Sequence, residues 1–131
     1  MTDSVDTVRA FLAASQQGDR ETMAALLHPE AEVHEADSLP YAGRHRGLEG
    51  FLALVKRVFT SFRDTRVEIE TLLGDGELVV VLATLSGRSK TSGESFHMPV
   101  NEVWRLRDGQ IISITPYYFD TARLNQLAGA S

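Results

Sequence analysis

Glu102 lies on a strand face that is otherwise apolar. In segment 95–107 the even-numbered side chains share one face, because successive residues of a strand point to opposite sides. The other five are large and apolar: Phe96, Met98, Val100, Trp104 and Leu106. A carboxylate in these surroundings is either a core or dimer-contact group with a polar partner, or a pocket acid whose pKa is raised by burial. Both interpretations stay open here, and the second makes Glu102 a candidate catalytic residue.

Glu35 is a second carboxylate in register with apolar residues. Ala31, Val33 and Glu35 share one face of a short predicted strand, and His34 points to the other face. A shift of one residue would reverse this and turn His34 inward. A charge at a strand end is commonly solvated, but this position also suits a carboxylate at the rim of a pocket.

The hairpin that follows Leu106 decides which of two tyrosines shares the Glu102 face. A two-residue loop would place Tyr117 there, whereas a three-residue loop with a bulge would place Tyr118 there. We prefer the three-residue loop, which pairs Leu106 with Gln110, because it brings two isoleucines to the apolar face. It predicts that this face also carries Ile112, Ile114, Pro116 and Tyr118.

Other residues capable of chemistry form no familiar motif. The four histidines, His28, His34, His45 and His97, include no pair with the i, i+4 spacing of a helical zinc site. Cysteine is absent, which excludes disulfides and thiolate chemistry. There is also no phosphate-binding glycine loop and no GxSxG nucleophile elbow. We therefore predict neither a metal nor a cofactor.

Composition places the chain among ordinary globular domains. Its 131 residues suit one domain over 1–131, with 43% hydrophobic and 24% charged residues. Thirteen basic against eighteen acidic residues give a net charge of −5, which disfavours nucleic acid and anionic membranes as partners. No apolar run approaches the roughly 18 residues of a membrane span. The acidic N-terminus is unlike a signal peptide, so we expect a cytoplasmic protein.

The periodicity changes once along the chain, from helical to alternating. Helical spacing predicts helices from Val5 to Gly18, from Asp19 to a stop at Pro29, and over 48–62. Strands are predicted over 31–35, from Thr65 to a hairpin at 74–76, and over 78–85, 95–107 and 110–118, followed by a last helix between Asp120 and Gly129.

Two segments have a more specific expectation. Residues 78–85 are nearly all apolar, which predicts a central strand buried on both faces. Residues 36–47, with the basic Arg44-His45-Arg46, are predicted to form a loop. The resulting order of helices followed by hairpin-linked strands indicates an α+β domain, whose curved antiparallel sheet packs on the three N-terminal helices and leaves a cavity between the layers.

This order of elements, with Glu35 and Glu102 in place, resembles the NTF2-like (cystatin-like) superfamily and its SnoaL-like branch. That branch includes polyketide cyclases, and ketosteroid isomerase is a more distant relative. The resemblance covers nearly the whole chain, and the segments that carry it are Gln17-Gly18-Asp19, Leu27-His28-Pro29-Glu30-Ala31-Glu32-Val33, Gly43-Arg44-His45-Arg46-Gly47, Val103-Trp104-Arg105-Leu106-Arg107-Asp108-Gly109-Gln110-Ile111, Tyr117-Tyr118-Phe119-Asp120 and Asn125-Gln126-Leu127.

The resemblance implies a cone-shaped fold with its ligand site inside. By position, Glu35 corresponds to the isomerase's general-base aspartate, and Glu102 to the protonated aspartate that donates to the oxyanion. One departure is clear, since the isomerase's oxyanion tyrosine corresponds to Phe11.

Two functions are consistent with these observations. The first is a cofactor-independent isomerase, cyclase or dehydratase acting on a small apolar or cyclic carbonyl compound, with Glu35 and Glu102 as acid/base groups. The second is a non-catalytic binding or dimerisation module that holds an apolar or aromatic ligand. Both use one expected pocket, lined by Phe11, Val33, Phe51, Val55, Phe59, Met98, Val100, Trp104 and Tyr118. The resemblance also implies a homodimer formed through the outer sheet face, including His97, Asn101, Val103 and Arg105.

Overall fold

Three of the four helices among the described residues begin at an aspartate that accepts a backbone N–H. In the computed structural model, which describes residues 3–128, Asp3 accepts from the Asp6 amide (2.8 Å), Asp19 from Thr22 (3.1 Å) and Asp120 from Arg123 (3.0 Å). These caps start α1 (Ser4–Gln17), α2 (Arg20–Leu26) and α4 (Thr121–Leu127), and α3 spans Gly47–Ser61. Gly129, the predicted end of the last helix, lies outside the described residues.

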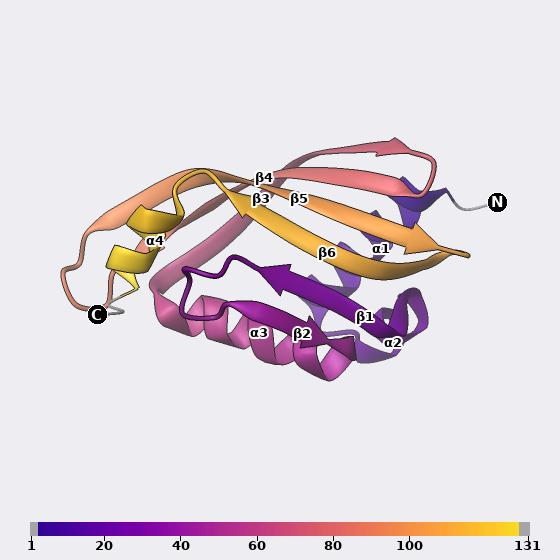
Figure 1. The fold of residues 1–131 in the computed structure, drawn as a ribbon, viewed down its shortest axis with the longest axis horizontal. Helices are drawn as coiled ribbons and strands as arrows, with labels where there is room; N and C mark the ends of the chain where they lie inside the picture. The colour runs from indigo at the N-terminus through magenta and orange to yellow at the C-terminus, as the bar shows by residue number, and fades with distance from the viewer. Residues whose placement is uncertain (1–2, 129–131) are drawn as a thin grey trace.

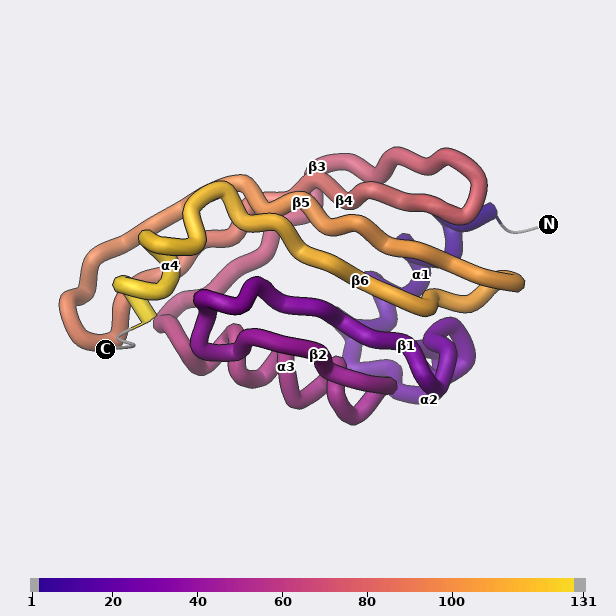
Figure 2. Tube along the Cα trace, viewed as in Figure 1, coloured from indigo at the N-terminus to yellow at the C-terminus, as the bar shows by residue number. Residues whose placement is uncertain are grey.

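Six strands form one sheet that arches over α1 and α3 (Figure 1). They are β1 (Leu27–Glu35), β2 (Gly43–Arg46), β3 (Arg63–Asp75), β4 (Leu78–Arg88), β5 (Ser95–Arg107) and β6 (Gln110–Tyr118), in the spatial order β2-β1-β6-β5-β4-β3. The α2 helix lies at one end of the arch and α4 at the other (Figure 2). This arrangement confirms the α+β class with a curved sheet packed on helices, although the pairing of β1 with β6 is parallel.

The expected loop 36–47 contains the edge strand β2, so this part of the prediction is wrong. Arg44 and Arg46 lie across from β1, and both form ion pairs with Glu32, at 3.2 and 3.3 Å. Cross-strand pairs of opposite charge stabilise such a ladder, and exposed charged side chains suit a sheet edge. The basic cluster resembles a loop in sequence because this edge strand has no buried apolar face and so lacks the apolar alternation that predicts a strand.

The β5–β6 turn also differs from the prediction. Arg107 pairs with Gln110 across a two-residue turn, in which Asp108 (φ 51°) and Gly109 (φ 80°) both have positive φ, as a type I′ turn requires. A bulge farther along then shifts the register. As a result Leu106 pairs with Ile111 rather than with Gln110, and Ile111 rather than Ile112 is buried. The predicted inward positions of Ile114, Pro116 and Tyr118 are confirmed.

The β4 strand is buried on one face only. Val79, Val81, Ala83 and Leu85 are at most 1% exposed, whereas the alternate side chains on the outer face are partly exposed. The prediction of burial on both faces is therefore wrong for the single chain. Among residues 3–128, no helix combines the length and apolarity that crossing a membrane demands.

Candidate functional site

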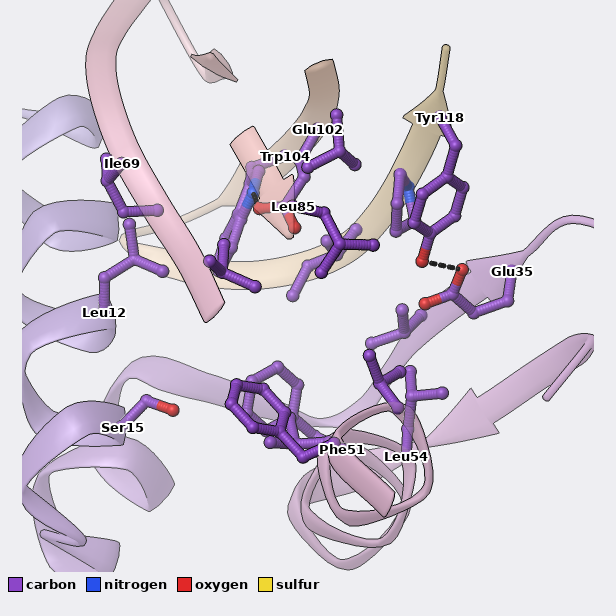
Figure 3. A pocket seen from close by; sticks show the side chains of 18 of the residues that line it. Leu12, Ser15, Glu35, Phe51, Leu54, Ile69, Leu85, Glu102, Trp104 and Tyr118 are labelled. Carbon is purple, nitrogen blue, oxygen red and sulfur yellow. Dashed lines mark hydrogen bonds between the residues drawn. The ribbon is translucent and has the colours of Figure 1, made fainter. Parts of the chain in front are cut away.

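A cavity of about 460 Å³ lies between the inner face of the sheet and helices α1 and α3 (Figure 3). Its size falls in the range of roughly 300–1,000 Å³ typical of small-molecule sites. The lining comes from seven elements and is mostly apolar: Leu12, Ser15 and Gln16 from α1; Val33 and Glu35 from β1; Phe51, Leu54, Val55, Val58 and Phe59 from α3; Val67 and Ile69 from β3; Leu85 from β4; Val100, Glu102 and Trp104 from β5; Ile114, Pro116 and Tyr118 from β6.

The structure brings both predicted carboxylates and seven of the nine expected lining residues to this cavity: Val33, Phe51, Val55, Phe59, Val100, Trp104 and Tyr118. Phe11 and Met98 do not line it, which corrects that part of the expectation. Phe11 is fully buried, with its ring centroid 5.1 Å from that of Phe51 and 5.7 Å from that of Trp104. Phe11 therefore packs against Phe51 and Trp104, two side chains that line the cavity. Met98 is 4% exposed and belongs to the core.

Glu35 points inward from the end of β1 and is only 3% exposed, whereas His34 is exposed on the other face. The Tyr118 hydroxyl donates a hydrogen bond of 2.7 Å to Glu35 Oε1, as Figure 3 shows. Tyr118 is thus the inward tyrosine, and Tyr117 is 61% exposed. The hydrogen bond occupies one carboxyl oxygen of Glu35 and leaves Oε2 available to take a proton.

Burial raises the pKa of Glu35 to about 7, well above the usual carboxyl value of 4.5. The hydrogen bond from Tyr118 acts in the opposite direction, because it favours the charged form, and the nearby Glu102 carboxyl adds to the increase. A carboxyl with this pKa is present in both protonation states near neutral pH, which suits a general acid or base.

Glu102 is half-buried and lines the cavity from the middle of β5. Burial raises its pKa, and the indole N–H of Trp104, which donates to Glu102 Oε1 at 3.0 Å, acts in the opposite direction. Because Oε1 accepts from the indole, the proton of neutral Glu102 is best carried on Oε2. Neutral Glu102 can therefore donate a hydrogen bond to an oxygen in the cavity.

The two carboxylates reach the cavity from strands on either side of β6. Glu102 on β5 pairs with Pro116 of β6, and Glu35 lies two residues beyond Val33, which pairs with Ile114 of β6 in the parallel β1–β6 ladder. One strand therefore separates the strands that carry the two acids on the inner face of the sheet.

The charges around the cavity are all acidic. Its lining residues include two carboxylates but no lysine, arginine or histidine. An anionic ligand would therefore face repulsion without a compensating cation, whereas a neutral carbonyl compound would not. Among residues 3–128, no three side chains of the usual metal-binding types lie close enough together to hold an ion.

Replacing Trp104 with phenylalanine tests the proton placement on Glu102. The substitution removes the indole N–H that favours the carboxylate, so we expect the pKa of Glu102 to rise further. Carboxyl NMR titration of the glutamate-labelled protein measures this change, with exposed Glu94 as an internal reference. An unchanged or lower Glu102 pKa would show that the indole does not control this carboxyl group.

The sequence analysis did not single out eight of the lining residues, namely Leu12, Ser15, Gln16, Leu54, Val58, Val67, Ile69 and Leu85, nor Tyr41, which packs against Tyr118. Leu12, Ser15 and Gln16 have the i, i+3, i+4 spacing that places them on one face of α1. Leu54 and Val58 lie on the same face of α3 as the expected Phe51, Val55 and Phe59. Helical spacing from those three could have identified Leu54 and Val58. Tyr41, fully buried behind Tyr118, had no such signal because it lies in an irregular segment.

An arched sheet that encloses a cavity with its helices defines the NTF2-like fold, and comparison with known proteins shows this fold. An NTF2-like protein from Burkholderia thailandensis is 26% identical, with a TM-score of 0.84 over 97% of this chain and 98% of that one. TerC, co-crystallised with polyporic acid, is 20% identical, with a TM-score of 0.80 over 98% and 100%. A proposed SnoaL-like polyketide cyclase from Jannaschia is 22% identical, with a TM-score of 0.76 over 98% and 93%.

The family follows from the sequence match. The model of the SnoaL-like domain matches residues 8–114, so this chain belongs to the SnoaL-like family. No curated protein matches the chain at a significant level.

Proposed function

We propose that this protein catalyses cofactor-independent proton transfer at a carbon next to a carbonyl group, in a small apolar or cyclic compound. The observation that carries the proposal is the pair of inward carboxylates. Each has one oxygen held by a donor, Tyr118 on Glu35 and Trp104 on Glu102, and each has its other oxygen free. The apolar cavity between them suits a neutral ring system.

In the proposed reaction, Glu35 Oε2 removes a proton from the carbon next to the carbonyl. The C–H electron pair forms the enolate double bond, and the carbonyl π electrons move to oxygen. Neutral Glu102 donates a hydrogen bond to that oxygen, which stabilises the developing charge. In a substrate with a carbon–carbon double bond next to the enolate, Glu35 returns the proton to the far carbon of that double bond while the carbonyl re-forms, completing an isomerisation. Alternatively the enolate carbon attacks a second carbonyl, whose π electrons move to its oxygen, and the proton held by Glu35 passes to that oxygen, completing a ring closure.

Tyr118 acts on the base in this proposal and not on the substrate. Its single hydroxyl proton is used by Glu35, so the group supports the base rather than the substrate oxygen. Phe11 supplies no hydroxyl either and does not reach the cavity. Glu102 is therefore the proposed oxyanion donor.

Deuterium exchange of β-tetralone, a bicyclic ketone, tests the proposal. We expect the wild-type protein in D₂O to speed deuteration next to the carbonyl well above the buffer rate, as followed by proton NMR. Absence of acceleration, while β-tetralone binds and quenches the fluorescence of Trp104, would favour the binding module. Trp104 is the only tryptophan of the chain and lines the cavity, so its fluorescence reports occupancy directly.

A binding module without catalysis is the second candidate, and Phe11 favours it. The side chain at the position of the isomerase's oxyanion tyrosine has no donor, so only one oxyanion donor remains. TerC, which has the same fold, was crystallised with polyporic acid, and this supports an aromatic ligand in the cavity here.

We also propose that two chains pair through the outer face of the sheet. This face carries the half-exposed Leu82 and Val103 and the exposed Tyr117, and apolar or aromatic groups suit such contacts. We expect a sedimentation mass of about 29 kDa, twice the 14.5 kDa of one chain. Leu82→Glu is expected to lower the mass to that of one chain, whereas Ala24→Glu on exposed α2 should not. A wild-type mass near 14.5 kDa at tens of micromolar would contradict pairing.

A further inference from the structure

Tyr41 is held rigidly in the segment that joins β1 to β2. The residue is fully buried, and its backbone carbonyl accepts a hydrogen bond of 2.9 Å from His45 Nε2. The neighbouring Pro40 carbonyl accepts from the Arg57 guanidinium on α3. The β2 strand, through His45, and the α3 helix, through Arg57, therefore hold the backbone around Tyr41 in position, although this segment is irregular.

The Tyr41 hydroxyl has no hydrogen-bond partner among the described protein atoms. A buried hydroxyl without a partner is unfavourable, and native proteins supply one in the large majority of cases. The residue does not line the cavity, so a ligand there does not supply the partner. The groups packed around Tyr41 can supply this partner.

Tyr118 is the neighbour that can accept this proton. Its ring lies edge-on to that of Tyr41, with 6.5 Å between the ring centroids. Its own proton is donated to Glu35, so its oxygen still has lone pairs to offer. Tyr41 in turn has a proton and no acceptor, so the two hydroxyls complement each other.

The pKa of Tyr41 is consistent with the closeness of its hydroxyl to that of Tyr118. Burial is the main cause that raises the pKa of Tyr41 to about 12, the Tyr118 hydroxyl acts in the opposite direction, and the charge of Glu35 adds to the increase. Tyr41 therefore keeps its proton throughout the neutral range and is available as a donor.

We propose that Tyr41 is a positioning residue, whose hydroxyl donates to the Tyr118 oxygen and so completes a chain of donors ending on Glu35. Donation to Tyr118 polarises its O–H bond and strengthens its hydrogen bond to the Glu35 carboxylate, because hydrogen bonds in series reinforce one another. The chain thus holds Glu35 Oε1 in place and favours its ionised form. The catalytic consequence rests on the proposed function, but the hydrogen bond itself does not.

Tyr41→Phe tests the chain without any substrate, by NMR titration of the Glu35 carboxyl. We expect the pKa of Glu35 to rise by a few tenths of a unit, and the melting temperature to fall by about 3 °C. The control Tyr117→Phe removes a hydroxyl that is exposed to solvent, and should change neither value. An unchanged Glu35 pKa together with a higher melting temperature would show that the hydroxyl is unpartnered, and would overturn the proposal.

A double-mutant comparison separates the chain from simple packing. In a Tyr118→Phe background, Tyr41→Phe should leave the pKa of Glu35 unchanged, since the link between them is already missing. An equal shift in both backgrounds would contradict the chain. If Tyr41→Phe does not fold, the NMR spectrum of the wild-type protein provides the test. The proposal requires a cross-peak between the Tyr41 hydroxyl proton and the protons of the Tyr118 ring, and the absence of this cross-peak would overturn the proposal. If the protein does not accelerate the deuteration of β-tetralone, this would contradict the proposed function but not the hydrogen bond from Tyr41 to Tyr118.

Discussion

Replacing Glu35 with glutamine is expected to lower the rate of β-tetralone deuteration by about 100- to 10,000-fold, the usual contribution of a general base. The amide has almost the shape of the carboxyl group and its oxygen can still accept from the Tyr118 hydroxyl. It cannot remove a proton from carbon at neutral pH. The loss should therefore fall on the chemical step.

Binding of the ketone distinguishes loss of chemistry from loss of the site. We expect the affinity of Glu35→Gln for β-tetralone, measured by Trp104 fluorescence, to stay within about threefold of the wild-type value. A threefold change in affinity corresponds to under about 1 kcal/mol of binding free energy. Glu30→Gln is the matched control, because Glu30 lies on the same strand but is exposed. A variant that keeps the wild-type exchange rate would remove Glu35 from the mechanism and leave the binding module.

The same substitution is expected to stabilise the protein at alkaline pH. Glu35 has a pKa of about 7 when folded and about 4.5 when unfolded, so between these values the folded state binds more protons. Stability from this group is thus fully present below pH 4.5 and decreases as pH rises to 7. The difference of about 2.5 units corresponds to about 3 kcal/mol lost by pH 8. Glu102, whose pKa is also raised, acts with the same sign.

Urea unfolding at pH 5 and pH 8 measures this cost. We expect the wild-type free energy of unfolding to fall by about 2.5 kcal/mol from Glu35 alone over that interval, and the fall in Glu35→Gln to be smaller by that amount. At lower pH the trend reverses, because Asp19, bonded to Thr22, and Glu32, bonded to Arg46, have lowered pKa values and lose their stabilisation as they become protonated. Equal pH dependence in the two proteins would show that Glu35 is not buried in solution.

The two expected results have one cause. Burial beneath the arched sheet makes Glu35 a base near neutral pH, and the same burial makes its charge unfavourable for folding. Loss of turnover together with gain of stability is the pattern expected where function requires a locally unfavourable group. A structural carboxyl with satisfied partners would show the opposite, since its removal would destabilise the protein.

Local patterns in the sequence determined much of this fold. The aspartate caps, the α3 stripe and the alternation along β5 each follow from spacing within a single element, so they predict which side chains point inward. Alternation placed Glu102 among apolar side chains and gave Glu35 an inward position in one of two registers, and both side chains line the cavity. These predictions depend on no contact between distant parts of the chain.

Only the tertiary structure decided how these elements meet. The β2 strand forms by pairing with β1, where Arg44 and Arg46 form ion pairs with Glu32. The β5–β6 turn has two residues instead of the predicted three, and the bulge in β6 then shifts the register of the strand. The sequence identified two acids in register with apolar neighbours. The fold decided that Tyr118 holds one of them and Trp104 the other, because pairing between strands and the depth of a cavity depend on register and packing, which local spacing does not encode.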